Sequence, residues 1–245
     1  MTSRLRNVQI DVPADGYGGA VDFWAAALGG QPVAIDGGRF TRMEGMAGLL
    51  GLHLQRLDDG PARVHLDLEA DDVDATVDLM VDRGATLIGQ GAGGPVLADP
   101  GGNLLCVCAT GTGEHLRAPT DDDARLHVLV IDVPSASFQQ TGDFWGHVLG
   151  IEAERLPAPF DAYIRVENAP AVGGPIRVLV QDIGADAVPR LHLDLHVPDG
   201  AARNRHVDRL AGLGGTVVER TYPWTVMTDP VGTVFCVVPD KPDPQ

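Results

Sequence analysis

Cysteine, basic side chains and long apolar runs are all scarce in this chain of 245 residues. Its three cysteines, Cys106, Cys108 and Cys236, are too few and too odd in number for the disulfide framework of a small secreted domain. Cys106 and Cys108 share one face of a strand by the two-residue period, but a lone C-x-C pair is only a weak metal signal. The three cysteines are therefore interpreted as buried and free.

Basic residues are outnumbered, with 18 lysines and arginines against 34 aspartates and glutamates and a formal net charge of −16. Such a charge repels phosphate backbones, so we expect no nucleic-acid partner. It favours solubility and, as an alternative, the attraction of a cationic small molecule. No apolar run approaches the roughly 20 residues that cross a bilayer, and the N-terminal MTSRLRNVQIDV has no apolar segment before a cleavage site. We therefore expect a cytoplasmic monomer or homodimer with no membrane partner.

Self-similarity, by contrast, runs along the whole chain. A repeat of about 110–120 residues is too long for a solenoid unit and predicts a duplicated domain. The matched pairs are VDFWAAALGG (21–30) with GDFWGHVLGI (142–151), RVHLDL (63–68) with RLHLDL (190–195), and LADPGGNLLCV (97–107) with MTDPVGTVFCV (227–237).

The repeat also sets the expected domain boundaries. We predict one module over residues 1–110, a second over 125–240 and a tail over 241–245. Residues 111–124 between the modules are polar, rich in Gly, Pro and Asp, and without apolar periodicity, which is typical of a linker.

Each repeat contains a smaller pattern twice. A strand, such as VQIDV (8–12), leads into a helix that carries Phe-Trp and ends at Gly29 or Gly150, and further strands follow. HLDL then opens a second strand, and DDVDATVDLMVDRGA (71–85) has the apolar spacing of an amphipathic helix. Two short strands and an Asp-Pro-x-Gly turn precede the last strand. The sequence therefore predicts an α+β fold of four βαβββ units in two tandem modules.

These motifs together, the FWxxxLG helix, the HLDL strand and DPxGNxxCV, resemble the vicinal oxygen chelate superfamily. The superfamily includes glyoxalase I, bleomycin-resistance proteins, fosfomycin-resistance enzymes and extradiol dioxygenases. The resemblance covers both repeats, and it is nearest to glyoxalase-like domains. It implies that each module forms a strongly curved mixed sheet around a cleft that binds a small molecule.

The resemblance also implies positions for metal ligands, because metal-dependent members place them on four strands that face the cleft. A divalent metal (Zn, Fe, Mn or Ni) on His65, His53 and His192 is one implication, and no metal at all is the other, since the usual carboxylate is absent. An exchange of halves between the modules would allow mixed sites. In this sequence the resemblance places the first-strand position at Asn7 and Val128, and the position at the end of the first unit at His53 or Gln55 and at Leu179 or Gln181. The position at the start of the second unit falls on His65 and His192, and the last falls on Cys106 and Cys236, where such members carry glutamate.

The HLDL strands pair histidine with carboxylate. The two-residue period puts His65 and Asp67 on one face of the strand, and likewise His192, Asp194 and His196. This face is either the solvated side of a strand whose leucines enter the core, or a polar lining of the cleft. In the second case His65 and His192 act as acid–base residues whose tautomer the neighbouring acid holds.

Aromatic and amide side chains complete the predicted site. Trp24 and Trp145 lie at helical spacing among apolar neighbours and are predicted to pack in the core. Trp224 in YPWTV begins a strand and can stack on a ligand or close the rim of the cleft, whereas the first repeat has a glycine-rich lid or plain loop there, GQGAGGPV (89–96). The residues predicted to bind the ligand are Asp67, Asp194, His196, Trp224, Gln55 and Gln181.

Three functions remain open from the sequence. The first is an enzyme of lyase, isomerase or cyclase type acting on a small oxygen-rich metabolite, with His65 and His192 as its catalytic residues. The alternative is a metal-free protein that sequesters an antibiotic or another small molecule, as bleomycin-resistance proteins do. The third is a degenerate regulatory or assembly module.

Overall fold

A computed structural model describes residues 3–111, 116–118, 124–171, 173–221 and 223–241. Most of the predicted linker and of the predicted tail lies outside these residues. The first repeat contains β1 (Arg4–Pro13), α1 (Tyr17–Leu28), β2 (Gln31–Ile35), η1 (Asp36–Gly38), β3 (Phe40–Glu44), β4 (Gly51–Leu57), β5 (Arg63–Ala70), α2 (Val73–Asp82), β6 (Thr86–Gln90), β7 (Pro95–Ala98) and β8 (Leu104–Ala109). The second contains β9 (Arg125–Val133), η2 (Ser135–Ser137), α3 (Phe138–Leu149), β10 (Glu154–Arg155), β11 (Tyr163–Ala169), β12 (Ile176–Asp182), β13 (Arg190–Asp199), α4 (Gly200–Gly212), β14 (Thr216–Arg220), β15 (Thr225–Thr228) and β16 (Val234–Lys241).

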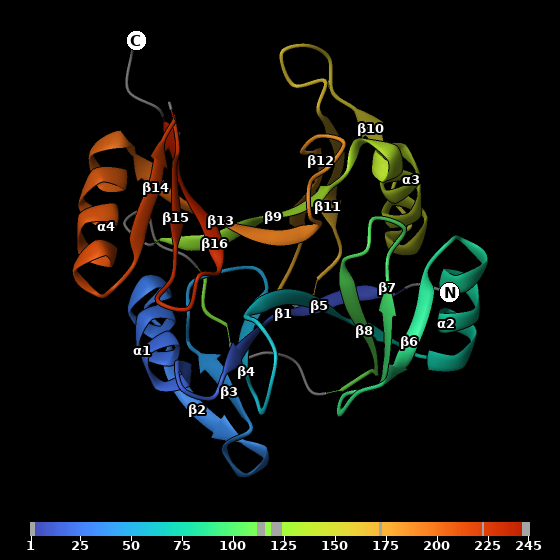
Figure 1. Cartoon of the computed structure of the whole chain (residues 1–245), viewed down its shortest axis with the longest axis horizontal. Coiled ribbons are helices and arrows are strands. Elements are labelled where there is room, and N and C mark those ends of the chain that lie inside the picture. Colours follow the sequence, from blue (N-terminus) through green and yellow to red (C-terminus); the bar gives the residue numbers. More distant parts are fainter. Residues whose placement is uncertain (1–2, 112–115, 119–123, 172, 222, 242–245) are drawn as a thin grey trace. The chain divides into compact units, whose positions relative to one another are not determined.

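Each repeat forms an eight-stranded mixed sheet, so the predicted α+β fold of four βαβββ units is confirmed (Figure 1). The strand order is β2-β3-β4-β1-β5-β8-β7-β6 in the first sheet and β10-β11-β12-β9-β13-β16-β15-β14 in the second. The short neighbouring strands pair antiparallel, whereas the HLDL strands β5 and β13 run parallel to β8 and β16. A parallel pair needs a crossover connection, and helices α2 and α4 provide it.

Helix ends follow the local sequence. Gly29 and Gly150 adopt φ of 66° and 67° after α1 and α3, a left-handed conformation that costs glycine little because it has no Cβ atom. Asp72 and Asp199 cap α2 and α4, each accepting a backbone N–H bond from the residue three positions later. Both predicted glycine stops are therefore confirmed.

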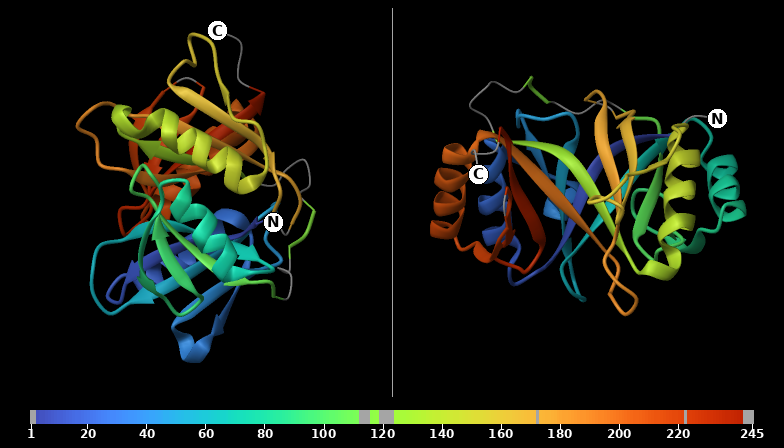
Figure 2. Two further views of the ribbon diagram at one scale, coloured as in Figure 1. Left: turned by 90° about the vertical axis from the view of Figure 1, so that its right-hand side faces the viewer. Right: turned by 90° about the horizontal axis from the view of Figure 1, so that it is seen from above.

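Two compact units divide the chain, and neither coincides with a sequence repeat. Unit 1 comprises residues 1–8, 65–113 and 129–191, and unit 2 comprises 9–64, 114–128 and 192–245. Unit 2 thus places α1 of the first repeat against α4 of the second, which lie side by side in both Figure 1 and Figure 2. Each unit combines half of both repeats, and the modules predicted at 1–110 and 125–240 stay a prediction.

The FW and DP motifs explain this pairing of halves. In unit 2 the indole Nε1 of Trp24 donates to Asp229 Oδ2 at 2.9 Å, across 205 residues of sequence. In unit 1 Trp145 Nε1 donates to Asp99 Oδ2 at 2.9 Å. Both tryptophans are fully buried, which confirms the predicted core packing. Each repeat therefore supplies a tryptophan to one unit and an aspartate turn to the other.

The aspartates of these turns are buried together with their partners. The other oxygen of Asp229 accepts backbone N–H bonds from Val231 and Thr233, which closes the Asp-Pro-x-Gly turn. Burial raises the pKa of Asp99 and of Asp229 above the usual aspartate range, although the bonds from tryptophan and backbone lower it. Among the described residues, the helices are all too short or too polar to cross a membrane.

Candidate functional site

Strands β13 and β16 of unit 2 bring three possible metal ligands together. The parallel register sets Asp194 opposite Cys236, and the two-residue period puts His192 on the same face of β13 as Asp194. A ring nitrogen of His192, a carboxylate oxygen of Asp194 and the sulfur of Cys236 all lie within 4.8 Å of one another. His192 Nε2 is 3.7 Å from Asp194 Oδ1. His192 and Cys236 are buried, and Asp194 is partly buried.

Farther along β13, His196 belongs to a chain of polar contacts. Its Nδ1 is 2.8 Å from Asp240 Oδ1, and Arg125 Nη2 donates to the other oxygen of Asp240 at 2.6 Å. The rings of His127 and His196 meet edge to face with centroids 4.7 Å apart. Burial raises the pKa of Asp240, but the bonds from Arg125 and His196 outweigh burial and hold that pKa below its usual value.

A counterpart of the first cluster lies on β5 and β8 of unit 1. Asp67 stands opposite Cys106, as Asp194 stands opposite Cys236. His65 Nε2 is 3.4 Å from Asp67 Oδ1, and Asn7 Nδ2 donates to Asp67 Oδ2 at 3.0 Å. The predicted pairs His65–Asp67 and His192–Asp194 are therefore both present as close contacts.

Cys108 distinguishes the unit 1 cluster from that of unit 2. Its sulfur is 4.0 Å from that of Cys106, and Asp67, Cys106 and Cys108 form the second group whose ligand atoms lie within 4.8 Å. The Cys106 thiol also donates to the Gly94 carbonyl at 3.6 Å. The hydrogen bond between the two sulfurs and burial raise the pKa of Cys106, while the same bond lowers the pKa of Cys108. All three cysteines lie outside any disulfide and are buried, as predicted.

The remaining predicted residues lie outside these two groups. His53 is buried on β4, and Gln55 on the same strand accepts a 2.6 Å bond from Gln9 Nε2. Gln181 on β12 faces Tyr163 across the ladder, and Trp224, partly buried, directly precedes β15. Neither His53 nor His65 belongs to a group of three possible ligands among the described residues. Their roles as ligands stay predictions.

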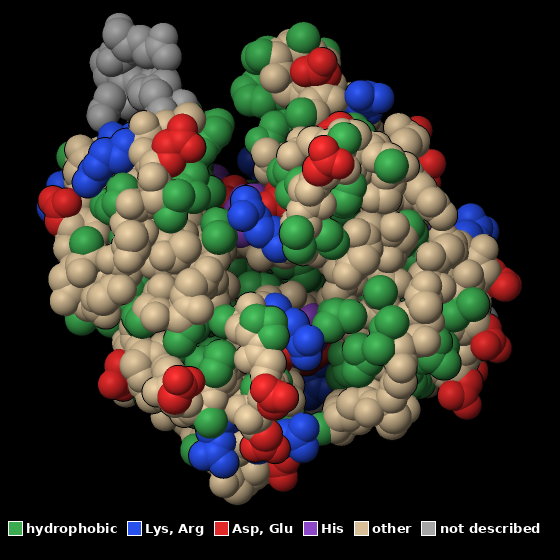
Figure 3. Space-filling model, viewed as in Figure 1, with side chains coloured by type: hydrophobic (Ala, Val, Ile, Leu, Met, Phe, Trp, Pro, Cys, Tyr) green, Lys and Arg blue, Asp and Glu red, His purple; other side chains and the backbone are tan. Residues whose placement is uncertain are grey.

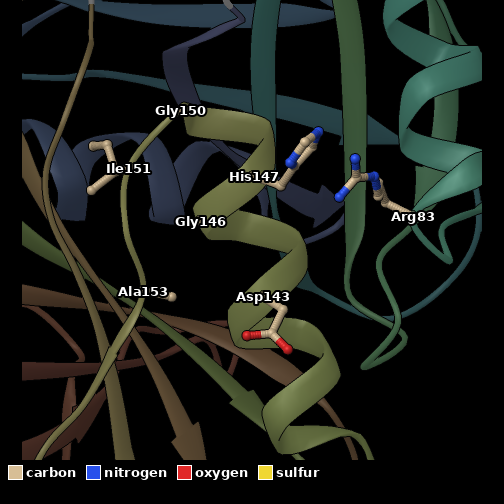
Figure 4. Close-up of a pocket in the computed structure, with 7 residues that line it drawn as sticks. All are labelled: Arg83, Asp143, Gly146, His147, Gly150, Ile151 and Ala153. Atoms are coloured by element: carbon tan, nitrogen blue, oxygen red, sulfur yellow. The ribbon is translucent and has the colours of Figure 1, made fainter.

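Unit 1 also has a shallow pocket of about 450 Å³. None of the residues predicted for the site lines this pocket. Figure 4 shows Asp143 and His147 projecting from α3, and Arg83 coming from the end of α2. Gly146, Gly150, Ile151 and Ala153 complete the lining, so few polar groups converge in it. On the face drawn in Figure 3, charges of both signs are scattered and little histidine surface is visible. We therefore base the site on the strand clusters.

The donor atoms of the unit 2 cluster suit a divalent metal. Zinc takes imidazole nitrogen, carboxylate oxygen and thiolate sulfur, and catalytic zinc sites use three protein ligands and leave one position open. His192, Asp194 and Cys236 offer one of each type. Val128, at the family's first-strand position, is a buried aliphatic side chain that cannot bind a metal. The ligand set is therefore compact but departs from the histidine and glutamate set that the resemblance implies.

Sequence reasoning passed over three residues of these clusters, His127, Arg125 and Asp240, and interpreted Cys108 as a buried free cysteine. Cys108 carried a signal, because C-x-C places two thiols on one strand face. The contact between His196 and Asp240 spans 44 residues and depends on the parallel register of β13 and β16. No local pattern reveals it.

Comparison with known proteins agrees with this architecture. A family model described as a glyoxalase-like domain matches residues 7–108 and again 128–238, and no curated protein matches the chain. The Mn(II)-bound glyoxalase from Novosphingobium aromaticivorans is 18% identical, with a TM-score of 0.70, over 97% of this chain and 82% of that one. The 2,3-dioxygenase LapB from Pseudomonas sp. KL28 is 16% identical, with a TM-score of 0.65, over 100% and 95%. At these identities the two structures share the fold of this chain.

Proposed function

Because the chain belongs to the glyoxalase-like domain family of the vicinal oxygen chelate superfamily, we propose that it is an enzyme of lyase, isomerase or cyclase type acting on a small oxygen-rich metabolite. The observation that carries the proposal is the unit 2 cluster, in which His192, Asp194 and Cys236 converge within 4.8 Å on adjacent strands. Clusters of this kind are where substrate oxygens can be polarised and protons moved.

His192, Asp194 and Cys236 would hold one divalent metal, of which Zn, Mn, Fe and Ni are the candidates. When bound, the metal supplies Lewis-acid polarisation of a substrate oxygen. Cys236 would bind as the thiolate, its thiol proton passing to solvent, and His192 would bind through an unprotonated ring nitrogen. The buried sulfur and imidazole also limit the access of water to the metal.

His196 is the residue that the geometry equips to move a proton. The Asp240 carboxylate can only accept, so the 2.8 Å contact requires the proton on Nδ1 of His196. The neutral ring then presents a basic Nε2, which can take a proton from a substrate carbon or hydroxyl group. Arg125 holds Asp240 charged and in place by its own bond. In unit 1 His65 Nε2 lies 3.4 Å from Asp67 Oδ1, but the proposed reaction uses the unit 2 residues alone.

A metal-free binding protein is the alternative that one feature favours. Trp224 is partly exposed next to β15, and on that strand Val226 stands opposite Cys236. An indole at this place can stack on an aromatic or cationic ligand, and the charge of −16 attracts cations. This alternative needs Trp224 and does not need His192.

Catechol, a small molecule with two adjacent oxygens, is the probe that tests the proposal. We expect catechol to raise the Tm of the Mn²⁺- or Zn²⁺-loaded protein, because a ligand that binds only the native state stabilises it. His192→Ala should abolish this shift, while His147→Ala, which alters the pocket of Figure 4, should leave it unchanged. Equal shifts in wild type and His192→Ala would refute the proposal. A shift that needs no metal and is lost in Trp224→Ala would establish the alternative instead.

A further inference from the structure

We propose that Asp67, Cys106 and Cys108 form a second, thiolate-rich zinc site in unit 1, independent of the proposed reaction. Strand β8 alternates its side chains, so the two sulfurs project from one face, and the β5–β8 register brings Asp67 opposite Cys106. The three ligand atoms lie within 4.8 Å of one another. Only Cys106 stands at a position where the resemblance implies a ligand; Cys108 does not.

The spacing of the sulfurs agrees with tetrahedral zinc. Two thiolates bound at about 2.3 Å and at a tetrahedral angle are separated by about 3.8 Å. The sulfurs of Cys106 and Cys108 are 4.0 Å apart, so little movement is required. A disulfide would need them at about 2.05 Å, which is half the observed separation. The pair is therefore arranged for a shared cation more closely than for oxidation.

The turn before β7 lies against the sulfurs of Cys106 and Cys108. It is closed by a 2.8 Å bond from Gly91 N to Gly94 O. A Cβ atom on Gly93 would lie 3.2 Å from the Cys108 sulfur and 3.7 Å from that of Cys106, so any other residue there would crowd the two thiols. Gly94 has φ of 152°, and a Cβ atom there would lie 2.0 Å from the carbonyl oxygen of Val107. The glycine-rich segment thus lies against the thiols and covers them with backbone alone.

Asn7 and His65 orient the carboxylate of the site. Asn7 Nδ2 donates to Asp67 Oδ2 at 3.0 Å, and His65 Nε2 lies 3.4 Å from Oδ1. Hydrogen bonds of this kind fix the direction of a metal-binding carboxylate and contribute to affinity. Asn7 and His65 are therefore positioning residues of the zinc site.

Unit 2 cannot form an equivalent site. Val238 occupies the place on β16 that Cys108 occupies on β8, two residues after the shared cysteine. The two groups therefore differ in the chemical softness of their metal ligands. The unit 1 group offers two sulfurs and an oxygen, whereas the unit 2 group offers one nitrogen, one oxygen and one sulfur. Binding in unit 1 exchanges one Zn²⁺ for the two thiol protons, which pass to solvent.

Cadmium titration of Cys236→Ser tests the proposal, because this variant removes the sulfur of unit 2. We expect one Cd²⁺ per chain and a thiolate-to-metal charge-transfer band with the intensity of two thiolates. Adding Cys108→Ser should halve the band or abolish it, and adding Asn7→Ala should keep the band but weaken binding about tenfold or more. Competition with Zn²⁺ should remove the band.

The outcomes separate this site from that of the proposed function. Cys108→Ser alone should still bind a metal through His192, Asp194 and Cys236, with the band of a single thiolate. Circular dichroism confirms that each variant is folded. A folded Cys236→Ser protein without a charge-transfer band, or one whose band survives Cys108→Ser at full intensity, would overturn the second site and leave the first untouched.

Discussion

His206 on α4 makes unit 2 sensitive to acid. Its side chain is buried, and Arg209 Nη2 lies 3.0 Å from Nδ1, which therefore accepts. The proton must then be on Nε2, which has no hydrogen-bond partner among the described residues. Burial, and next the charge of Arg209, lower the pKa of His206 from 6.5 to about 4. The folded chain resists protonation there, whereas the unfolded chain accepts a proton at the ordinary pKa.

The sign and size of the effect follow from this difference. A group with a depressed folded pKa contributes stability above its unfolded pKa and loses it as pH falls toward the folded value. At pH 5 the unfolded state holds the proton and the folded state does not, which costs about 2 kcal/mol relative to pH 7. This window stays above the isoelectric point of about 4.6, where solubility is lowest.

His206→Leu replaces the titrating group with an apolar side chain of similar size. We expect the free energy of unfolding of wild type to fall between pH 7 and pH 5 by about 2 kcal/mol more than that of the variant. Urea denaturation at pH 7, 6 and 5 measures the difference, and an NMR titration of the His206 ring gives the folded pKa directly. Leu210→Ala on the same helix is the control and should lower stability equally at every pH. Parallel curves for wild type and His206→Leu would refute the reasoning.

Three further changes in stability follow from the fold, each measured by urea denaturation at pH 7. Trp145→Phe removes the bond to the buried Asp99 and should cost about 2 kcal/mol; no loss would show that the bond contributes nothing. Gly150→Ala forces a Cβ atom into a left-handed helix end and should cost about 1 kcal/mol. Gly19→Ala, inside α1 with open space around it, should instead stabilise by about 0.5–1 kcal/mol, so a loss there would contradict the helix assignment.

Much of the fold could be predicted because local patterns determine it. The predicted helix over 71–85 is observed at Val73–Asp82, and its apolar spacing and the Asp72 cap both lie within the segment. The glycines that end α1 and α3 and the HLDL strands could likewise be predicted from short stretches of sequence. The burial of Trp24 was predictable from its apolar neighbours, but its bond to Asp229 was not, because the two lie 205 residues apart.

The site was predictable only in part, for the same reason. The pairing of His192 with Asp194 follows from the two-residue period along one strand. Convergence with Cys236 requires knowledge of which strand lies beside β13 and in which register. Cys108 was interpreted as a free cysteine because C-x-C alone says nothing of the carboxylate that the neighbouring strand brings to it. His53, Gln55 and Gln181 remain predictions from the resemblance.

The tryptophan–aspartate pairs have a consequence for cutting the chain. A polypeptide ending at the linker would carry Trp24 without Asp229 and Asp99 without Trp145, so it would hold one incomplete half of each core. The two fragments would then complement each other when mixed, as the pieces of a single split protein do. If each half of a split reporter protein were fused to one fragment, the reporter signal would therefore return only when both fragments are present.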